Sequence, residues 1–574
     1  MKHITLATAI ALFLSVSAAH AAAPADTIFA RDKGILPDSG TDCTEAVRKM
    51  LDETGGNSVI VFDRGRYDFS REKATALKVF VSNTSSEQEC ADKTKHFGVW
   101  ISEKDNLKII GDGTLWIFHG DMTPIGINRS SNITLCGITV DFERPGGSEM
   151  TYEKVEKGSV VCRMHKDSWY EINDGHLELV GEGWKSKLIH CIRYTPSDGH
   201  FKHCGEYNIL ANSKAEEIEK GLIRFSTPED FAPIVGSTLT LRDIIRREVG
   251  TLIQYSSDIV LKGMHYQYMH GLGVVSQYTH NVAVTGCEFA PDPASGRFLA
   301  SSADFLHFSG CSGHIAVTNC YFCGAQDDPI NVHGTNLRIM EASGNTVKVR
   351  FMHGQSYGYE AFRVGEEVAF VDPERMARYA RAKVTGVERL SDYEIRLTLD
   401  GSVPKDVVLE RDCMENMTCT PSVYIARNTF TRTSTRGVLV TTPRKVVIED
   451  NEFISTGMTA ILIEGDALDW FESGPVTDVT IRRNTFTDCA FHGGPNHATI
   501  AINPSNTKVG PEYPVHRNIR ITDNTFNIFY GPALSAKSVR GLTFKRNSVN
   551  GEGTNILRGC SKVKTDAVAT IIER

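Results

Sequence analysis

Apolar and polar residues alternate in short, similar segments along most of the chain. Units of nine residues recur, with apolar residues at the second and fourth positions and usually an aromatic or apolar residue at the ninth. The units are NLKIIGDGT from Asn106, NITLCGITV from Asn132, DIVLKGMHY from Asp258, NVAVTGCEF from Asn281, HIAVTNCYF from His314, SVYIARNTF from Ser422, KVVIEDNEF from Lys445, DVTIRRNTF from Asp478, NIRITDNTF from Asn518 and GLTFKRNSV from Gly541. Alternation with a period of two is typical of a β-strand that buries one face.

The spacing of these units predicts a solenoid. Several begin 23 residues apart, as from 258 to 281 and from 422 to 445, and others 33 or 40 apart, which is one unit plus an insertion. Strand-rich repeats of about 20–30 residues stack into solenoids, and the helical Leu spacing of leucine-rich repeats is absent. We therefore predict an all-β fold, a right-handed parallel β-helix whose coils stack at the strand spacing of about 4.8 Å.

An asparagine recurs at the seventh position of the later units. The column comprises Asn428, Asn451, Asn484, Asn524 and Asn547. We expect these side-chain amides to hydrogen-bond along the stack and to the turn backbone. We also expect these asparagines to take the left-handed conformation that such a corner needs. Their predicted role is structural.

Two stretches, 142–257 and 333–421, lack coil units and alternate like antiparallel strands. Each contains a similar segment, VGSTLTLRD from Val235 and VGEEVAFVD from Val364. We predict two inserted small antiparallel β-barrel-like domains at these places, with coils over 22–141, 258–332 and 422–574. Long excursions from one solenoid face often wall in a binding groove, although they can also cap the coils or form a homo-oligomer.

The N-terminal segment has the form of a secretory signal peptide. Lys2 and His3 precede an apolar stretch, and the small-residue site Ala19-His20-Ala21 follows it, so residues 1–21 are predicted to be removed on export to a periplasm or the medium. No later stretch reaches the ~20 apolar residues of a membrane span. The formal net charge of −8 comes without a basic run, which argues against a nucleic-acid partner.

The chain has 14 cysteines, all after the signal peptide. Cys320 and Cys323 form a CxxC, but no second pair completes a zinc site. We predict buried thiols, no zinc site at this pair and no cofactor. The sequence leaves the disulfide pairing open.

The second strand of each coil can be aligned by its apolar residues. The inward positions are Val274, Leu306, Ile330, Val438, Ile461 and Ile500. The residues that alternate with these positions point outward and form two columns. The first column holds His307, Asn331, Leu439 and Leu462, and the second holds Gln277, Ser309, His333, Thr441, Glu464 and Asn503. Three charged residues occupy one equivalent position in successive coils, two residues before Leu306, Ile330 and Val438. They are Asp304, Asp328 and Arg436.

Asp304 and Asp328 should therefore be neighbours on one surface, with Asp327 beside them. Clustered carboxylates repel each other, which raises the pKa of at least one. One neutral acid beside ionised carboxylates is what glycoside hydrolysis requires. The same cluster would also suit the Ca²⁺ site of a polysaccharide lyase, with Arg436 as the base. A third interpretation is that these are solvated aspartates of a turn, since Asp-Asp-Pro is a common turn sequence. The spacing leaves these three interpretations open.

The segment from Thr251 to Gly334 resembles glycoside hydrolase family 110, the bacterial exo-acting α-1,3-galactosidases. The stretches that carry the resemblance are RREVGTLIQYSSDIVLKGMHYQYMHGLGVVSQ, SADFLHFSGCSG, CGAQDDPINVHGTN and, from Thr139, TVDFERP. The resemblance implies metal-independent hydrolysis with inversion that releases galactose from blood-group B-type and related glycans. It also implies that Asp304, Asp327 and Asp328 are the catalytic aspartates.

The spacing of carboxylates constrains their roles. Inverting enzymes keep their two carboxyl groups roughly 6.5–9.5 Å apart, whereas directly stacked residues lie only about 4.8 Å apart. We therefore expect a diagonal pair. The hypothesis is that Asp304 donates the proton while Asp327 and Asp328 position and activate water; swapped roles are the close alternative.

Other residues are candidates for binding sugar hydroxyls or a sugar face. They are His307, Asn331, His333, Arg436, Glu464 and, in the EGDALDWFESG loop, Trp470. For each, a structural role on the surface or in the loop is the alternative. Asp141, Glu143 and Arg144 are expected to hold the base of the first insertion.

The sequence predicts an exo-α-galactosidase whose partner is a galactose-terminated glycan. A polysaccharide lyase or endo-galacturonidase on the same scaffold, and a noncatalytic glycan-binding adhesin, are the alternatives. Whether a neighbouring fucose is required, and the oligomeric state, stay open.

Overall fold

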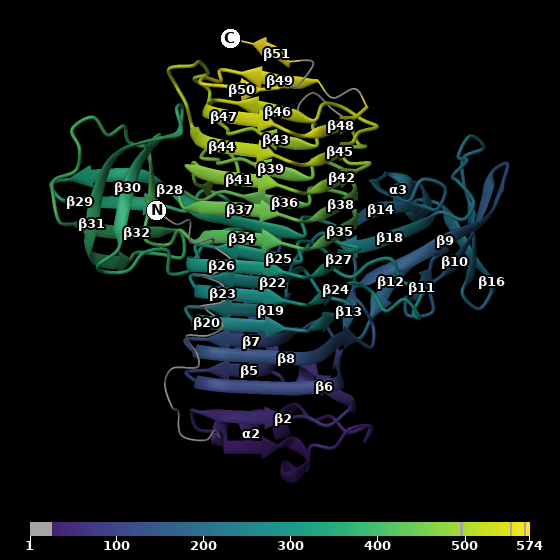
Figure 1. The fold of residues 1–574 in the computed structure, drawn as a ribbon. Coiled ribbons are helices and arrows are strands. Elements are labelled where there is room, and N and C mark those ends of the chain that lie inside the picture. The colour runs from purple at the N-terminus through teal and green to yellow at the C-terminus, as the bar shows by residue number, and fades with distance from the viewer. Residues whose placement is uncertain (1–25, 494–496, 552–553, 567–569, 574) are drawn as a thin grey trace.

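The computed structural model describes residues 26–493, 497–551, 554–566 and 570–573. The predicted signal peptide, residues 1–21, lies outside this range. The described chain winds into a long stack of parallel strands, and two antiparallel domains project from opposite sides of it (Figure 1). The parallel β-helix with two insertions is thus confirmed.

Each coil contributes strands to parallel sheets. The sheet built from the first half of the nine-residue units contains β6 (Asp105–His119), β8 (Ser131–Phe142), β20 (Ser257–Lys262), β23 (His280–Thr285), β26 (Ser312–Thr318), β34 (Ser422–Ala426), β37 (Lys445–Glu449), β41 (Asp478–Arg482), β44 (His516–Thr522) and β47 (Val539–Lys545). The sheet that carries the outward polar positions contains β7 (Thr123–Asn128), β19 (Val249–Gln254), β22 (Leu272–Gln277), β25 (Leu306–Ser309), β28 (Ile330–Ser343), β36 (Val438–Val440), β39 (Ile461–Ile463), β43 (Ile500–Ile502) and β46 (Leu534–Lys537).

The predicted register of the second sheet is confirmed. Leu306 pairs with Val274 on one side and Ile330 on the other, and the series continues through Val438 and Ile461 to Ile500. All six side chains are buried in the core cluster. Alternation then turns the residues between them outward, which determines the face on which the candidate site lies.

The asparagine column forms a hydrogen-bonded ladder. Asn428 Nδ2 donates to Asn451 Oδ1 at 3.0 Å, and the same bond repeats from Asn451 to Asn484, then to Asn524 and Asn547. The expected left-handed conformation of these asparagines is wrong. It belongs to the residue before each of them, with φ of 54–60° at Arg427, Asp450, Arg483, Asp523 and Arg546. The turn bends one residue earlier, which leaves the asparagine free to point inward.

The first insertion is an open sheet, whereas the second is a closed barrel. The first is a seven-stranded antiparallel sheet in the order β15-β14-β18-β9-β10-β17-β16, with a small sheet of β11 (Trp169–Asn173), β12 (His176–Gly181) and β13 (Trp184–Lys185) beside it. Its strands are β9 (Gly147–Glu156), β10 (Ser159–Met164), β14 (Ile189–Thr195), β15 (His200–His203), β16 (Lys214–Glu219), β17 (Leu222–Ser226) and β18 (Thr238–Asp243), and it carries helix α3 (Glu206–Ala211).

The second insertion is a closed antiparallel barrel. The extension of β28 pairs with β29 (Thr346–Arg350), and pairing continues through β32 (Glu394–Leu399), β31 (Ala377–Arg389), β30 (Glu367–Asp372) and β33 (Cys413–Asn416) back to β28. Because β28 belongs to both the coil and the barrel, the barrel is attached directly at the strand that follows Asp327 and Asp328.

Helix α2 (Thr44–Glu53) closes the N-terminal end of the stack, where Val47, Met50 and Leu51 join the core (Figure 1). Over the part of the chain that the structure describes, none of the helices has the length and apolar character to cross a membrane.

Candidate active site

Three charged residues stack at one position of successive coils. Asp304, Asp328 and Arg436 each lie two residues before the paired positions Leu306, Ile330 and Val438. The Phe305 N–H donates to the backbone carbonyl of Asp328 at 3.1 Å, which continues the ladder to the acidic residues. The repeat itself therefore places the carboxylates side by side.

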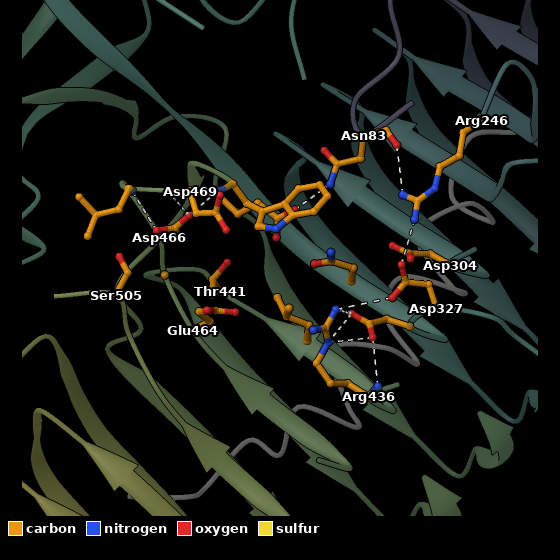
Figure 2. Close-up of a pocket in the computed structure, with 17 residues that line it drawn as sticks. Asn83, Arg246, Asp304, Asp327, Arg436, Thr441, Glu464, Asp466, Asp469 and Ser505 are labelled. Carbon is orange, nitrogen blue, oxygen red and sulfur yellow. Dashed lines mark hydrogen bonds and ion pairs between the residues drawn. The ribbon is translucent and has the colours of Figure 1, made fainter. Parts of the chain in front are cut away.

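These residues line a cavity of about 230 Å³ on the outer face of the second sheet (Figure 2). In that view Arg246, Asp304, Asp327 and Arg436 lie on one side, and Glu464, Asp466 and Asp469 lie on the other. Asp328 and Trp470 also line the cavity. The volume is below the roughly 300–1,000 Å³ that is usual for small-molecule sites. A cavity of this size suits one sugar ring better than a polymer segment.

Two arginines hold the adjacent aspartates. Arg436 Nε contacts both carboxylate oxygens of Asp328, at 2.9 and 2.8 Å, and its NH2 contacts Oδ2 at 2.8 Å. Asp327 Oδ2 accepts from Arg246 NH2 at 3.1 Å, whereas its Oδ1 is 3.6 Å from Arg436. Asp328 is therefore fully engaged, and Asp327 keeps an oxygen with free hydrogen-bonding capacity.

The three aspartates differ in their pKa values. Burial and then the negative charge of Asp327 raise the pKa of Asp304 to about 8. Burial also raises the pKa of Asp328, to about 7, and Arg436 offsets part of that rise. Burial acts on Asp327 too, but the guanidinium groups of Arg246, Arg436 and Arg242 outweigh it and lower its pKa. At neutral pH the site combines a neutral acid with an ionised carboxylate.

His307 and His333 lie behind the cavity wall rather than in the lining. Their side chains are fully buried, and His307 Nδ1 is 2.8 Å from Asp304 Oδ2. His307 Nε2 is 3.0 Å from His333 Nε2, and His333 Nδ1 is 2.7 Å from the carbonyl of Gly334. Burial lowers the pKa of His307 to about 4, so this ring is neutral. The structure thus places both histidines behind Asp304.

Other sequence candidates do line the cavity. They are Asn331, Arg436, Glu464 and Trp470. Burial raises the pKa of Glu464 to about 7. Trp470 is 40% exposed, and its ring stacks on His353 of the barrel insertion, with ring centroids 4.1 Å apart. Trp470 therefore presents an accessible aromatic face at the edge of the cavity.

Over the described residues, no group of three or more His, Cys, Asp and Glu side chains is arranged so that it could hold a metal ion.

Comparison with known families matches three parts of the chain. The GLAA-B beta-barrel domain I matches residues 148–239, and GLAA-B beta-barrel domain II matches residues 346–412. A model of the right-handed beta helix region matches residues 416–567, in agreement with the predicted hand of the coils.

Curated relatives extend the likeness to nearly the whole chain. Alpha-1,3-galactosidase A of Bacteroides fragilis strain YCH46 is 50% identical over 94% of this chain and 89% of its own length. Alpha-1,3-galactosidase A of Bacteroides thetaiotaomicron is 35% identical over 91% of this chain and 92% of its own. Alpha-1,3-galactosidase B of the same species is 37% identical over 90% and 85%. The chain belongs to glycoside hydrolase family 110.

The structure adds residues to this family 110 site that sequence reasoning missed. Arg246 comes from the segment between β18 and β19, and Asn83 comes from a loop before β5 (Thr94–Ser102). Glu472 of β40 (Glu472–Ser473) accepts from Asn83 Nδ2 at 2.7 Å. All three lie outside the repeat, so the column alignment could not find them. Only Arg246 had a sequence signal, because it lies in the stretch RREVG.

Proposed function

We propose that the protein is an exo-acting hydrolase that removes terminal α-1,3-linked galactose from blood-group B-type glycans, and from linear α-galactosyl glycans as well. The names of the relatives support the linkage and the sugar. The cavity of about 230 Å³ supports an exo mode of action, since it has room for one terminal residue. We also infer that the protein acts in a periplasm or outside the cell, because residues 1–21 have the form of a signal peptide.

One observation carries the proposal: Asp304 and Asp327 are neighbours in a cavity, and their surroundings displace their pKa values in opposite directions. Such a pair identifies an acid and a base. In our proposal Asp304 transfers its proton to the glycosidic oxygen as the bond to the anomeric carbon breaks. Asp327 takes a proton from the water whose oxygen attacks that carbon from the opposite face.

The arrangement favours inversion. Asp304 and Asp328 are stacked, about one strand spacing of 4.8 Å apart, which is too close for the acid and base of an inverting enzyme. Asp327 stands one residue out of the column and is therefore diagonal to Asp304. Asp328, held by both of its oxygens, orients Arg436 instead of activating water.

The proposal is tested by incubating the purified protein with the B-type trisaccharide and with the linear, unfucosylated disaccharide. We expect free galactose from both, measured with galactose dehydrogenase. Release from the trisaccharide alone would restrict the enzyme to fucosylated substrates. Unsaturated or oligomeric products from a polymer, or binding without release of sugar, would contradict the proposal.

A further inference from the structure

Two cysteines of the first insertion face each other across a hairpin. Cys191 lies in β14 and Cys204 directly follows β15, and their Sγ atoms are 3.3 Å apart. The Cys204 N–H donates to the Cys191 carbonyl at 3.2 Å, in register with the adjacent pair Ile192 and His203. The Cα atoms of such a hydrogen-bonded pair are about 5.5 Å apart, within the 4.4–6.8 Å that a disulfide spans.

We propose that Cys191 and Cys204 are an oxidation site that forms a disulfide with a disulfide oxidant such as oxidised glutathione. Cys204 is the more accessible of the two, whereas Cys191 is 6% exposed. The Cys204 thiolate attacks the oxidant and releases one thiol. The Cys191 thiolate then attacks the Cys204 sulfur and releases the second, so two thiols are oxidised and one disulfide is reduced.

The hairpin supports one side of the active site, which gives the crosslink a consequence. His190 of β14 pairs with Arg242 of β18, and Arg242 Nε donates to Gln326 Oε1 at 2.8 Å. Gln326 directly precedes Asp327. A disulfide at the open end of the β14–β15 ladder would resist separation of the strands behind this wall.

The test uses the native full-length protein, incubated with reduced or oxidised glutathione, then denatured, alkylated and mapped by peptide mass spectrometry. We expect a Cys191–Cys204 linked peptide only after oxidation, together with a higher melting temperature. Cys204→Ser should abolish the linked peptide, and Cys90→Ser, at another half-buried cysteine, should keep it. Separate alkylation of Cys191 and Cys204 after oxidation, or their linkage to other cysteines, would overturn the proposal.

An independent observation concerns the proton on Asp304. The Gly334 carbonyl only accepts, so the ring nitrogen His333 Nδ1 at 2.7 Å must carry a hydrogen. In a neutral ring His333 Nε2 is then an acceptor, and His307 Nε2 must donate to it at 3.0 Å. This leaves a lone pair on His307 Nδ1, 2.8 Å from Asp304 Oδ2. The hydrogen in that last contact therefore belongs to Asp304.

We infer that His307 and His333 are positioning residues that keep the catalytic proton on Asp304 until a glycosidic oxygen replaces His307 as its acceptor. This inference rests on the proposed function. The charged and titratable groups around Asp304 are His307 of β25, His333 of β28, Asp327 and Asp328 before β28, Arg436 before β36, Arg246 before β19 and Glu472 of β40.

The inference is tested by the pH dependence of kcat/KM in two variants. In His333→Leu, His307 Nε2 has lost its hydrogen-bond acceptor. The other tautomer of His307 can then donate its Nδ1–H to Asp304, which stabilises the carboxylate form. We expect the alkaline limb to move to lower pH by about one unit or more. In His333→Gln the amide oxygen replaces Nε2, and the limb should stay in place.

Identical alkaline limbs in the wild type and in a folded His333→Leu variant would overturn this inference and leave the proposed function intact. Failure of the wild type to release galactose would instead overturn the proposed function. Near-ultraviolet circular dichroism shows whether each variant is folded.

Discussion

At the scale of residues, three aspartates that are similar in sequence differ in surroundings. Asp304 has a neutral histidine as its hydrogen-bond partner, Asp328 has a guanidinium group on both oxygens, and Asp327 lies between two arginines. Burial alone would raise all three pKa values. The placement of Arg246 and Arg436 decides which aspartate stays ionised, and our proposal takes the acid and the base from that difference.

Replacing the proposed acid should affect substrates unequally. We expect Asp304→Asn to lower kcat/KM for the α-1,3-linked disaccharide by about 10²–10⁴, because its leaving group needs a proton. An aryl α-galactoside with a strongly activated phenol should lose far less, since that phenolate leaves unprotonated. Initial rates on both substrates check this, and an equal loss on both would show that Asp304 is not the acid.

The activity should fall at alkaline pH. The pKa of Asp304 is raised to about 8, and the proposed reaction needs its protonated form. Above that pH, kcat/KM for the disaccharide should fall about tenfold per pH unit. A pH–rate profile from pH 5 to 10 measures this. Activity that rises steadily to pH 10 would contradict a protonated Asp304.

Sequence reasoning placed Asp304, Asp328 and Arg436 on one face because they belong to the repeat, and Asp327 beside them because it precedes Asp328. It could not identify Asn83 and Glu472, which reach the cavity from a loop and a short antiparallel strand. It left His307 and His333 open between contact with the sugar and a structural role. Alternation predicts that both side chains point out of the coil. It carries no information about which other segments of the chain cover that face.

At the scale of elements, the coils are determined by patterns that can be read directly. The inward apolar positions alone predict the register of β22, β25 and β28, and the structure confirms it. The predicted left-handed corner lies one residue too late, because asparagine tolerates that conformation. In the structure each asparagine instead hydrogen-bonds to the next coil, and the residue before it takes the positive φ. Closure of the second insertion depends on long-range pairings, which alternation does not specify.

The asparagine ladder should contribute measurably to stability. Asn451→Ala removes the acceptor of Asn428 and the donor to Asn484, and leaves buried polar groups unpaired. We expect a loss of about 1–3 kcal/mol in the free energy of unfolding, seen as a lower urea midpoint. Asn550→Ala, at an exposed asparagine that bonds Asn527, is the matched control and should cost under about 0.5 kcal/mol. Equal midpoints for the two variants would refute a structural ladder.

At the scale of the whole molecule, the cavity is assembled from parts that are distant in sequence. Coils supply the aspartates, the end of the first insertion supplies Arg246, and the loop with Trp470 leans on His353 of the barrel. The insertions therefore complete a site that the solenoid alone would leave open to solvent.

Trp470 should bind the part of the substrate beyond the galactose. We expect Trp470→Ala to raise KM for the B-type trisaccharide about 3–10-fold, through loss of a stacking contact, with little change for a simple aryl galactoside. Trp470→Phe keeps an aromatic face and should recover part of the affinity. Unchanged KM for the trisaccharide in Trp470→Ala would mean that the ring serves only to anchor its loop.

The central claim is that Asp304 and Asp327 act on opposite faces of one galactose unit. Proton NMR of the galactose released in the first minutes of reaction tests it most directly. Our account predicts that the β-anomer appears first and then mutarotates. First formation of α-galactose would contradict it, because retention requires a covalent intermediate on one of these carboxylates.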